Sequence, residues 1–276
     1  MPELPEVEVC RQGVLPTVLG ARWQGAEVRQ PRLRQPVPET LAVDLAGRRI
    51  VDVLRRGKYL LMRSVRDDGD VGYLLIHLGM SGSLRFVAPD APPGRHDHVD
   101  LLLPTCRLRY GDPRRFGLVL WVPGDAPETH PLLAPLGLEP LAESCTVDRF
   151  VAAISSARTA IKPVLMDSHR IVGIGNIYAA ESLFRAGISP LRPANRISMR
   201  RYAQLLPAIR TTLSDAIAAG GSSIRDYVHS DGGAGCFQVD CAVYERAGQP
   251  CRRCGDTIRQ IRQSGRSTYY CAGCQR

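Results

Sequence analysis

The sequence begins MPELPEVE (residues 1–8), a stretch that combines a candidate nucleophile with the start of a helix. Removal of Met1 would turn the ring nitrogen of Pro2 from an amide into a free secondary amine, which titrates at roughly pH 8 like other terminal amines. Such an amine condenses with an aldehyde-level carbon to give a charged iminium, which withdraws electrons. Glu3 and Glu6 place two carboxylates near that amine, as proton transfer during covalent catalysis requires.

Apolar residues recur behind this stretch at the spacing of one helix face, and Pro5 suits the first turn of such a helix. The residues on this face are Val7, Cys10, Val14 and Val18. A helix here would fix the N-terminus against a core. The same stretch is also compatible with a proline-punctuated N-terminus that has no catalytic role.

Length and charge narrow the class of protein. A chain of 276 residues with 44% hydrophobic residues is long enough for two domains, each with its own core. The net charge of +9 and the pI near 9.3 indicate a polyanionic partner, nucleic acid first. No apolar run reaches the roughly 18 residues that span a bilayer, and no secretory signal is recognisable. We therefore expect a soluble, intracellular protein that does not contact membranes.

Short apolar runs divided by Gly, Pro and Asp clusters follow the first helix and predict a β-sandwich or flattened barrel. The runs cover residues 59–65, 73–87, 99–103 and 107–122.

Three polar insertions interrupt this region, and each carries a candidate functional residue. RRGK (55–58) ends in Lys58, and HLGMSG (77–82) places Met80 at a glycine-flanked turn. Taken alone, such a lysine is usually solvated surface and such a methionine usually core. RLRYGDPRRFG (107–117) interleaves basic and aromatic residues around a turn, a pattern that can hold phosphates and wedge a ring between bases.

His96 and His98 flank Asp97 before an apolar run. Two histidines around an aspartate could be metal ligands, but no third ligand is evident nearby. We interpret them as polar contacts.

A stretch rich in Pro, Gly and acidic residues, 123–143, marks a domain boundary. Helical periodicity follows it: Thr146 is a candidate helix cap, Pro163 a candidate helix start, and Ser198 a cap for a longer helix that Gly220 and Gly221 end. We therefore expect an N-terminal domain over 1–125, a linker over 126–143, a helical domain over 144–241 and a C-terminal module over 242–276.

IVGIGNIYA (171–179) lies between two of these helices. Gly173 and Gly175 allow a close backbone approach, and Asn176 opens the next helix, whose first N–H groups could hold a phosphate. A plain turn between helices is the alternative. It is not a dinucleotide fingerprint, because no strand precedes it and the third glycine is missing.

The last 26 residues contain two Cys-x2-Cys pairs separated by sixteen residues. This is zinc-ribbon spacing, and four thiolates leave no open position on the metal. We predict one structural Zn²⁺ held by Cys251, Cys254, Cys271 and Cys274. The other cysteines are scattered, which argues against a disulfide scaffold. Arg266 lies near the tip of the presumed hairpin between the pairs and is a plausible DNA probe.

In combination, these motifs resemble the formamidopyrimidine-DNA glycosylase family, bacterial base-excision enzymes that remove oxidised purines such as 8-oxoguanine and then nick the strand. The blocks that carry the resemblance run in order along nearly the whole chain: MPELPEVE, GKYLL (57–61), HLGMSGSLR (77–85), HDHVDL (96–101), DPRRFG (112–117), TAIKPVLMD (159–167), VGIGNIYAAESLF (172–184) and the C-terminal cysteine pairs. Leu4 favours this branch over the related endonuclease VIII branch.

The resemblance implies a catalytic role for four residues. Pro2 would attack C1′ of the damaged nucleotide and form the iminium, and Glu3 would donate the proton that helps open the sugar. Lys58 would be the general acid during elimination of the 3′ and 5′ phosphates. Arg266 would hold phosphate during that step.

The resemblance also implies how DNA is bound. Met80, Arg114 and Phe116 would fill the hole left by the extruded base. The positions that would contact DNA include His96, Arg114, Asn176, Glu6 and Lys162.

The implied fold class is α+β multidomain, with an N-terminal β-sandwich that carries an N-terminal helix, and a C-terminal helix-two-turn-helix domain plus zinc ribbon. Double-stranded DNA containing oxidised bases would lie between the domains, and the protein would act as a monomer in the bacterial cytosol or nucleoid.

Four positions depart from the family pattern: Ala157 replaces a basic residue, Cys236 an aromatic and Glu245 a glycine, and Cys241 is an extra thiol. Two alternatives therefore remain at this stage, a same-fold DNA-binding protein without activity and an endonuclease VIII-like enzyme that prefers oxidised pyrimidines. A zinc-ribbon transcription factor would leave the first eight residues unexplained.

Overall fold

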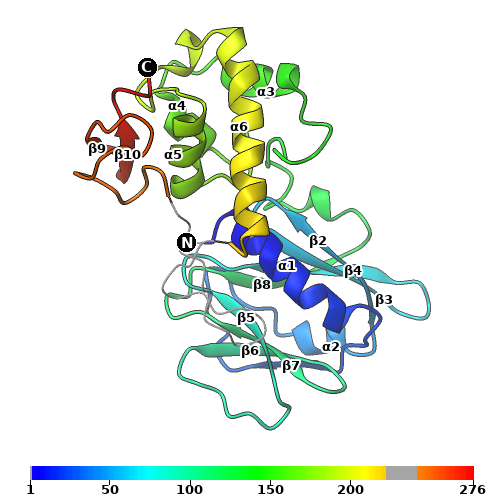
Figure 1. Ribbon diagram of the computed structural model, residues 1–276. Coiled ribbons are helices and arrows are strands. Elements are labelled where there is room, and N and C mark those ends of the chain that lie inside the picture. Colours follow the sequence, from blue (N-terminus) through cyan, green and yellow to red (C-terminus); the bar gives the residue numbers. More distant parts are fainter. Residues whose placement is uncertain (1, 222–240) are drawn as a thin grey trace. The chain divides into compact units, whose positions relative to one another are not determined.

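The computed structural model describes residues 2–221 and 241–276, which form two compact units (Figure 1). The first unit contains the described residues up to Ala134, together with Gly220 and Gly221. The second contains Pro135–Ala219 and the residues from 241 onward. Cys236, one of the departures from the family pattern, lies outside the described residues.

The first unit begins with helix α1 (Leu4–Val18), as the sequence predicts. Pro5 lies in its first turn, and the Glu6 carboxylate accepts a hydrogen bond of 2.7 Å from the backbone N–H of Glu3. That bond satisfies a donor that the first turn of a helix otherwise leaves unpaired. The buried face carries the four predicted residues, Val7, Cys10, Val14 and Val18.

Two antiparallel four-stranded sheets form the predicted sandwich in the first unit. One has the order β2–β3–β4–β8, and the other has the order β1–β6–β7–β5. The strands of the first sheet are β2 (Arg49–Arg56), β3 (Tyr59–Val65), β4 (Val71–His77) and β8 (Leu118–Pro123). The strands of the second are β1 (Gly25–Val28), β5 (Ser83–Val87), β6 (Asp97–Leu102) and β7 (Arg107–Gly111).

One apolar core holds this unit together. Residues of both sheets join it, such as Val53 of β2 and Leu108 of β7, and so does the buried face of α1. Helix α1 lies along β2, and the short helix α2 (Leu41–Leu45) adds two leucines to the core (Figure 1). The α+β class and the N-terminal sandwich are therefore confirmed.

The structure adds elements that the sequence pattern did not predict. Strands β1 and β2 and helix α2 are new, and turns divide each of the runs 73–87 and 107–122 into two strands. Strand β2 was missed because its basic end resembles a loop. The structure shows how such an end fits a strand: Arg55 donates a hydrogen bond of 2.9 Å to the Glu8 carboxylate of α1.

The second sheet contains a buried ion pair between Asp100 and Arg109. Arg109 donates hydrogen bonds of 2.7 and 2.8 Å to the Asp100 carboxylate, and Arg29 adds two of 2.6 and 3.1 Å. Burial raises the pKa of Asp100, but the bonds from Arg109 and Arg29 outweigh it and lower that pKa to about 2. Because the folded-state pKa lies below the unfolded value, the ionised carboxylate stabilises the fold above about pH 4.

We expect Asp100→Asn to lower the free energy of unfolding by about 3 kcal/mol at pH 7, since buried Arg109 loses its hydrogen-bonded counter-charge and keeps the Asp97 carboxylate only at 3.6 Å. The difference from wild type should shrink as the pH falls from about 4 toward 2, where wild-type Asp100 also protonates. Urea unfolding at several pH values measures this. The control is Asp67→Asn, which breaks an exposed pair with Arg22 and should change stability and its pH dependence far less, because solvent screens that pair. A difference that is constant with pH would contradict the interpretation.

The second unit is mainly helical, as predicted. Its helices are α3 (Val147–Ile154), α4 (Ile161–Leu165), α5 (Asn176–Arg185) and α6 (Met199–Ala218). The Thr146 hydroxyl accepts from the N–H of Arg149 and caps α3. Helix α6 ends before Gly220 and Gly221, both with positive φ. Helix α4 begins two residues before Pro163, the predicted start, which therefore lies inside the helix.

The C-terminal residues form a hairpin of β9 (Ile258–Gln263) and β10 (Arg266–Cys271). Ser264 and Gly265 make the two-residue turn, with φ of 47° and 77°, as tight hairpins prefer. Ile258 and Val243 pack in one cluster with Phe184 of α5. The Glu181 carboxylate of α5 also accepts three backbone N–H bonds, from Ala242, Val243 and Tyr244.

Glu245, which replaces the usual glycine of the family pattern, has φ of 56°. A side chain in this left-handed region costs roughly 1–2 kcal/mol, a cost that glycine does not pay. We expect Glu245→Gly to raise the free energy of unfolding by about 1 kcal/mol. Glu245→Ala is the control, because it removes the same carboxylate but keeps the strain. Chemical denaturation of the metal-loaded protein compares the two, and equal effects would refute the backbone explanation.

Candidate functional site

The start of α1 brings together the first three predicted site residues. Pro2 and Glu6 are buried, and Glu3 is only 2% exposed. The N-terminal end of a helix carries partial positive charge, which favours carboxylates at this place. The amine candidate and two carboxylates therefore lie within one ordered helix start. Their chemical roles stay predictions.

Lys58 lies in the two-residue turn between β2 and β3 and is half-buried. Arg55 connects this turn with α1, because it bonds both the Glu8 carboxylate at 2.9 Å and the carbonyl of Gly57 at 3.0 Å. Burial raises the pKa of Glu8, but hydrogen bonds from Arg11 and Arg55 lower it below its ordinary value. The ionised Glu8 thus helps to fix the turn that carries Lys58 relative to the helix start.

His77 ends β4 opposite Tyr59, with the two rings 4.8 Å apart. Burial, followed by the nearby charges of Lys58 and Arg34, lowers the pKa of His77 to about 4. The ring is therefore neutral at pH 7. Its Nδ1 atom accepts the N–H of Gly79 at 2.9 Å, so its proton is on Nε2 and can be donated. The sequence motifs do not single out His77. The feature that could have indicated its importance is the pairing of β4, which His77 ends, with β3, which follows Lys58.

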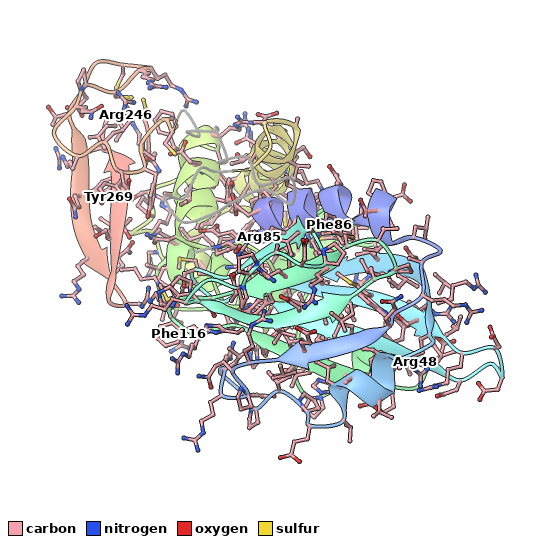
Figure 2. All side chains as sticks on the ribbon, turned by 90° about the horizontal axis from the view of Figure 1, so that it is seen from below. Arg48, Arg85, Phe86, Phe116, Arg246 and Tyr269 are labelled. Atoms are coloured by element: carbon pink, nitrogen blue, oxygen red, sulfur yellow. The ribbon has the colours of Figure 1, made fainter. Side chains whose placement is uncertain are left out.

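Two turns at one end of the sandwich present the predicted wedge residues. We call residues 78–82 the Met80 turn and residues 112–117 the Phe116 turn. Met80 is 36% and Phe116 47% exposed, and the Arg114 guanidinium lies 4.7 Å above the Phe116 ring. Phe116 lies at the opposite end of the unit from Arg48 (Figure 2). The structure therefore brings Met80, Arg114 and Phe116 to neighbouring exposed turns.

The two histidines around Asp97 differ in environment. His98 is buried, and its Nε2 lies 2.8 Å from the carbonyl oxygen of Asp112, a polar contact as predicted. His96 is exposed. Within residues 2–221 and 241–276, neither histidine belongs to a group of potential metal ligands.

In the second unit, Asn176 opens α5 as predicted and is held by two partners. Its Nδ2 donates to the carbonyl of Ser267 at 3.0 Å, and its Oδ1 accepts from Lys162 Nζ at 2.5 Å. Lys162 is only 1% exposed and also donates to the Thr268 hydroxyl at 2.9 Å. The direct DNA contact expected of Lys162 does not fit this burial. Lys162 instead orients Asn176 against β10, whose first residue is the exposed Arg266.

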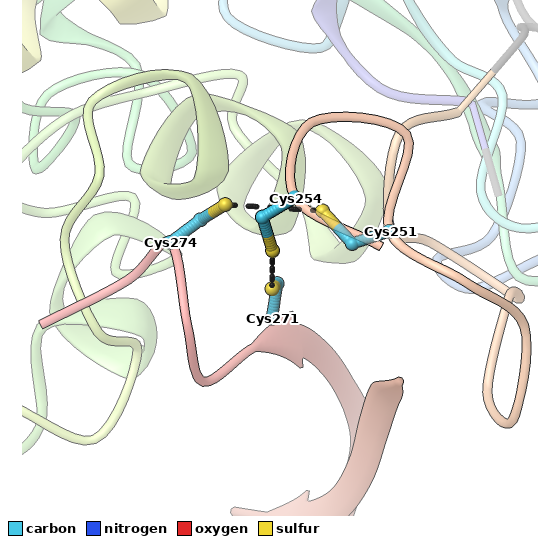
Figure 3. A group of neighbouring side chains, drawn as sticks. All are labelled: Cys251, Cys254, Cys271 and Cys274. Carbon is cyan, nitrogen blue, oxygen red and sulfur yellow. Dashed lines mark hydrogen bonds between the residues drawn. The ribbon is translucent and has the colours of Figure 1, made fainter. Parts of the chain in front are cut away.

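The four cysteines of the C-terminal pairs converge (Figure 3). Cys251 Sγ lies 3.8 Å from Cys274 Sγ, and Cys254 Sγ lies 3.4 Å from Cys271 Sγ. All four sulfur atoms lie within 4.8 Å of one another. Tetrahedral zinc with Zn–S bonds of about 2.3 Å separates its ligands by about 3.8 Å, so the group fits one zinc ion. The predicted ligands and cofactor are confirmed, and four thiolates make the site structural.

We expect Cys254→Ser to abolish stoichiometric zinc binding and to lower the melting temperature, because the metal replaces a core that this short segment cannot build. Removal of the metal by a chelator should lower stability and DNA affinity together. Cys106→Ser, outside the cluster, is the control and should keep one zinc per chain. Metal analysis and thermal unfolding provide the readouts. A zinc-free sample with wild-type stability would rule out a structural metal.

Comparisons with known proteins match this architecture along the chain. Three family models match: the formamidopyrimidine-DNA glycosylase N-terminal domain at residues 1–119, the formamidopyrimidine-DNA glycosylase H2TH domain at residues 136–228, and a zinc finger found in FPG and IleRS at residues 248–276.

Individual relatives are similar over their full length. The chain is 64% identical to a formamidopyrimidine-DNA glycosylase of Dechloromonas aromatica, with 100% of each chain covered. It resembles the Lactococcus lactis Fpg in complex with abasic-site DNA, with a TM-score of 0.90, 34% identity and 99% of each chain covered. It also resembles MutM in complex with DNA containing carbocyclic 8-oxo-G, with a TM-score of 0.89, 34% identity and 100% coverage of both chains. The chain therefore belongs to the formamidopyrimidine-DNA glycosylase family.

Proposed function

We propose that this protein excises oxidised purines, such as 8-oxoguanine and formamidopyrimidines, from double-stranded DNA and then cleaves the abasic strand. The full-length similarity to glycosylases, including one bound to 8-oxo-G DNA, supports this assignment. The observation that carries it is the buried start of α1, where Pro2 is followed by Glu3 and the nearby carboxylate of Glu6. Helix capping accounts for the two carboxylates, and the potential secondary amine beside them adds the nucleophile that the chemistry requires.

The first step is base removal. After loss of Met1, the Pro2 nitrogen attacks C1′ of the damaged nucleotide, a bond to C1′ forms, and the N-glycosidic bond breaks as the base leaves with the proton that the Pro2 nitrogen gives up. Glu3 donates a proton to the sugar ring oxygen, so that the ring opens and the nitrogen–carbon bond becomes an iminium. The enclosed position of Glu3 suits proton transfer, because bulk water cannot compete for the group.

The second step is strand cleavage. The positive iminium acidifies the C2′ proton, whose loss expels the 3′ phosphate by β-elimination, and δ-elimination then expels the 5′ phosphate. Lys58 is the general acid that protonates leaving oxygens, and Arg266 holds a phosphate while its bond breaks. Lys58 is fixed for this task by the Glu8–Arg55 link to α1.

DNA binding uses both units. Arg114, His96 and Asn176 contact the DNA, and Met80 and Phe116 fill the space of the extruded base. Glu6 lies beside the reacting nucleotide, and Lys162 acts through Asn176. The four cysteines hold the zinc, which supplies a stabilising cross-link and no redox or Lewis-acid step.

The chain divides by task into a catalytic domain (1–125), a linker (126–143), a DNA-binding helical domain (144–241) and a zinc ribbon (242–276). In the part of the chain that the structure describes, no helix has the length and apolar character needed to cross a bilayer. Because its substrate is DNA and its relatives are bacterial, we place the protein in the bacterial cytosol, at the nucleoid, as a monomer.

Borohydride trapping tests the chemistry directly, because it reduces the iminium to a stable amine. We expect a covalent complex with duplex containing 8-oxoguanine and attachment of the DNA to Pro2 in the digested peptide. An uncleaved N-terminal tag should lower trapping and cleavage by more than about 1,000-fold, because the Pro2 nitrogen is then an amide.

The same tag at the C-terminus serves as the control and should permit trapping. Attachment of DNA to Lys58, or trapping by the N-terminally blocked chain, would disprove the role of Pro2. Parallel assays with oxidised-pyrimidine duplexes test the substrate class, because faster cleavage of those would favour an endonuclease VIII-like preference.

A further inference from the structure

We propose that Asp112 is a positioning residue for extrusion of the damaged base, because its carboxylate locks the Met80 turn and the Phe116 turn into one rigid unit. Asp112 is 0% exposed and lies at the base of both turns. The inference rests on the proposed function.

The carboxylate fixes both ends of the exposed part of the Phe116 turn. Its Oδ1 accepts the backbone N–H of Arg114 at 3.2 Å, and its Oδ2 accepts that of Gly117 at 2.9 Å. Between these points Arg115 has φ of 56°, a strained conformation that persists only where its surroundings hold it. The two bonds therefore define how Arg114 and Phe116 project.

The same carboxylate also holds the Met80 turn. Ser81 Oγ, next to Met80, donates a hydrogen bond of 2.7 Å to Asp112 Oδ1. The turns are in close contact, since a Cβ on Gly79 would lie 2.4 Å from the backbone nitrogen of Gly117. Such packing leaves no room for one turn to move without the other.

Three further contacts fix Asp112 itself. The Tyr110 hydroxyl donates to Oδ2 at 3.2 Å. The backbone N–H of Asp112 donates to the carbonyl of His96 at 2.9 Å, and His98 Nε2 donates to the carbonyl of Asp112. One buried residue thus joins three segments: its carboxylate holds the turns that carry Met80 and Phe116, and its backbone holds the segment of the expected DNA contact His96. Its four carboxylate donors are neutral groups, so the arrangement specifies geometry rather than pairing a charge.

Rigidity at this place affects the reaction in a specific way. Turning a stacked base out of the duplex costs a few kcal/mol, which side chains inserted into the vacated space must offset. Insertion by preordered side chains avoids the entropy cost of ordering them during binding. An abasic site has no base to unstack, so its cleavage depends less on the two turns.

The experiment compares two reactions of Asp112→Asn under single-turnover conditions. Excision of 8-oxoguanine from a fully paired duplex should slow by about 10- to 100-fold, the loss typical of a misplacement near 1 Å. Strand cleavage at a preformed abasic site should stay within about threefold of wild type. Asp125→Asn, which alters an exposed carboxylate bonded to Arg63 and Tyr73, is the matched control and should leave both rates unchanged.

A double-mutant cycle tests whether Asp112 acts through the wedge residues. If it does, adding Asp112→Asn to a variant that lacks both wedge side chains, Met80→Ala/Phe116→Ala, should slow excision by no more than about a further twofold. Fluorescence of 2-aminopurine beside the lesion should show slower extrusion in Asp112→Asn. Ser81→Ala, which removes only the link to the Met80 turn, should slow excision by about three- to tenfold and provides a second variant if Asp112→Asn does not fold.

Parallel loss of excision and abasic-site cleavage, in proportion to the folded fraction, would overturn the inference. So would additive effects in the cycle, or wild-type extrusion in both Asp112→Asn and Ser81→Ala. If the wild-type chain itself cleaves neither substrate, the proposed function fails instead.

Discussion

The structure of the first unit depends on the burial of the first turn of α1. A nucleophile at the N-terminus is useful only if the first residues of the chain are ordered, yet chain ends usually fray. Here the apolar face of α1 enters the sandwich core, and the Glu6 carboxylate satisfies the N–H of Glu3. Burial along the whole helix therefore stabilises α1. The capped first turn extends this order to Pro2.

Two carboxylates elsewhere in this unit have been removed wholly or partly from water by packing, and arginine side chains satisfy both of them. Arg109 and Arg29 do so for Asp100, and Arg55 does so for Glu8. Arginine suits this role because its fork donates several hydrogen bonds in fixed directions. Asp112 is different, since its donors are backbone amides and hydroxyls. The ion pairs of Asp100 and Glu8 therefore link separate elements, whereas the carboxylate of Asp112 fixes the shape of two turns.

The sequence was sufficient for the features that depend on local spacing. The zinc ligands, the apolar face of α1, the Thr146 cap and strand β3 could all be predicted, because each depends on residues a few positions apart. Features that depend on residues far apart in the sequence could not be predicted. Lys162 resembles a surface cation until Asn176 and Thr268 are seen around it.

His77 and Asp112 were missed for the same reason. His77 acquires its low pKa from burial and from a lysine on a neighbouring turn, and Asp112 acquires its partners from three separate segments. The predicted roles of Pro2, Glu3, Lys58 and Arg266 derive from family resemblance and chemistry, and they remain proposals.

The hairpin of β9 and β10 is restrained at both of its ends. Metal ligands close it at Cys271, while near the turn the ammonium group of Lys162 bonds Thr268 and the Ser267 carbonyl. A hairpin held at both ends is rigid and does not bend between them. Oxidative damage to one thiolate would therefore be transmitted along β10 to the amide of Asn176, so an agent that attacks sulfur would disturb this proposed DNA contact without reacting at Pro2, the proposed nucleophile.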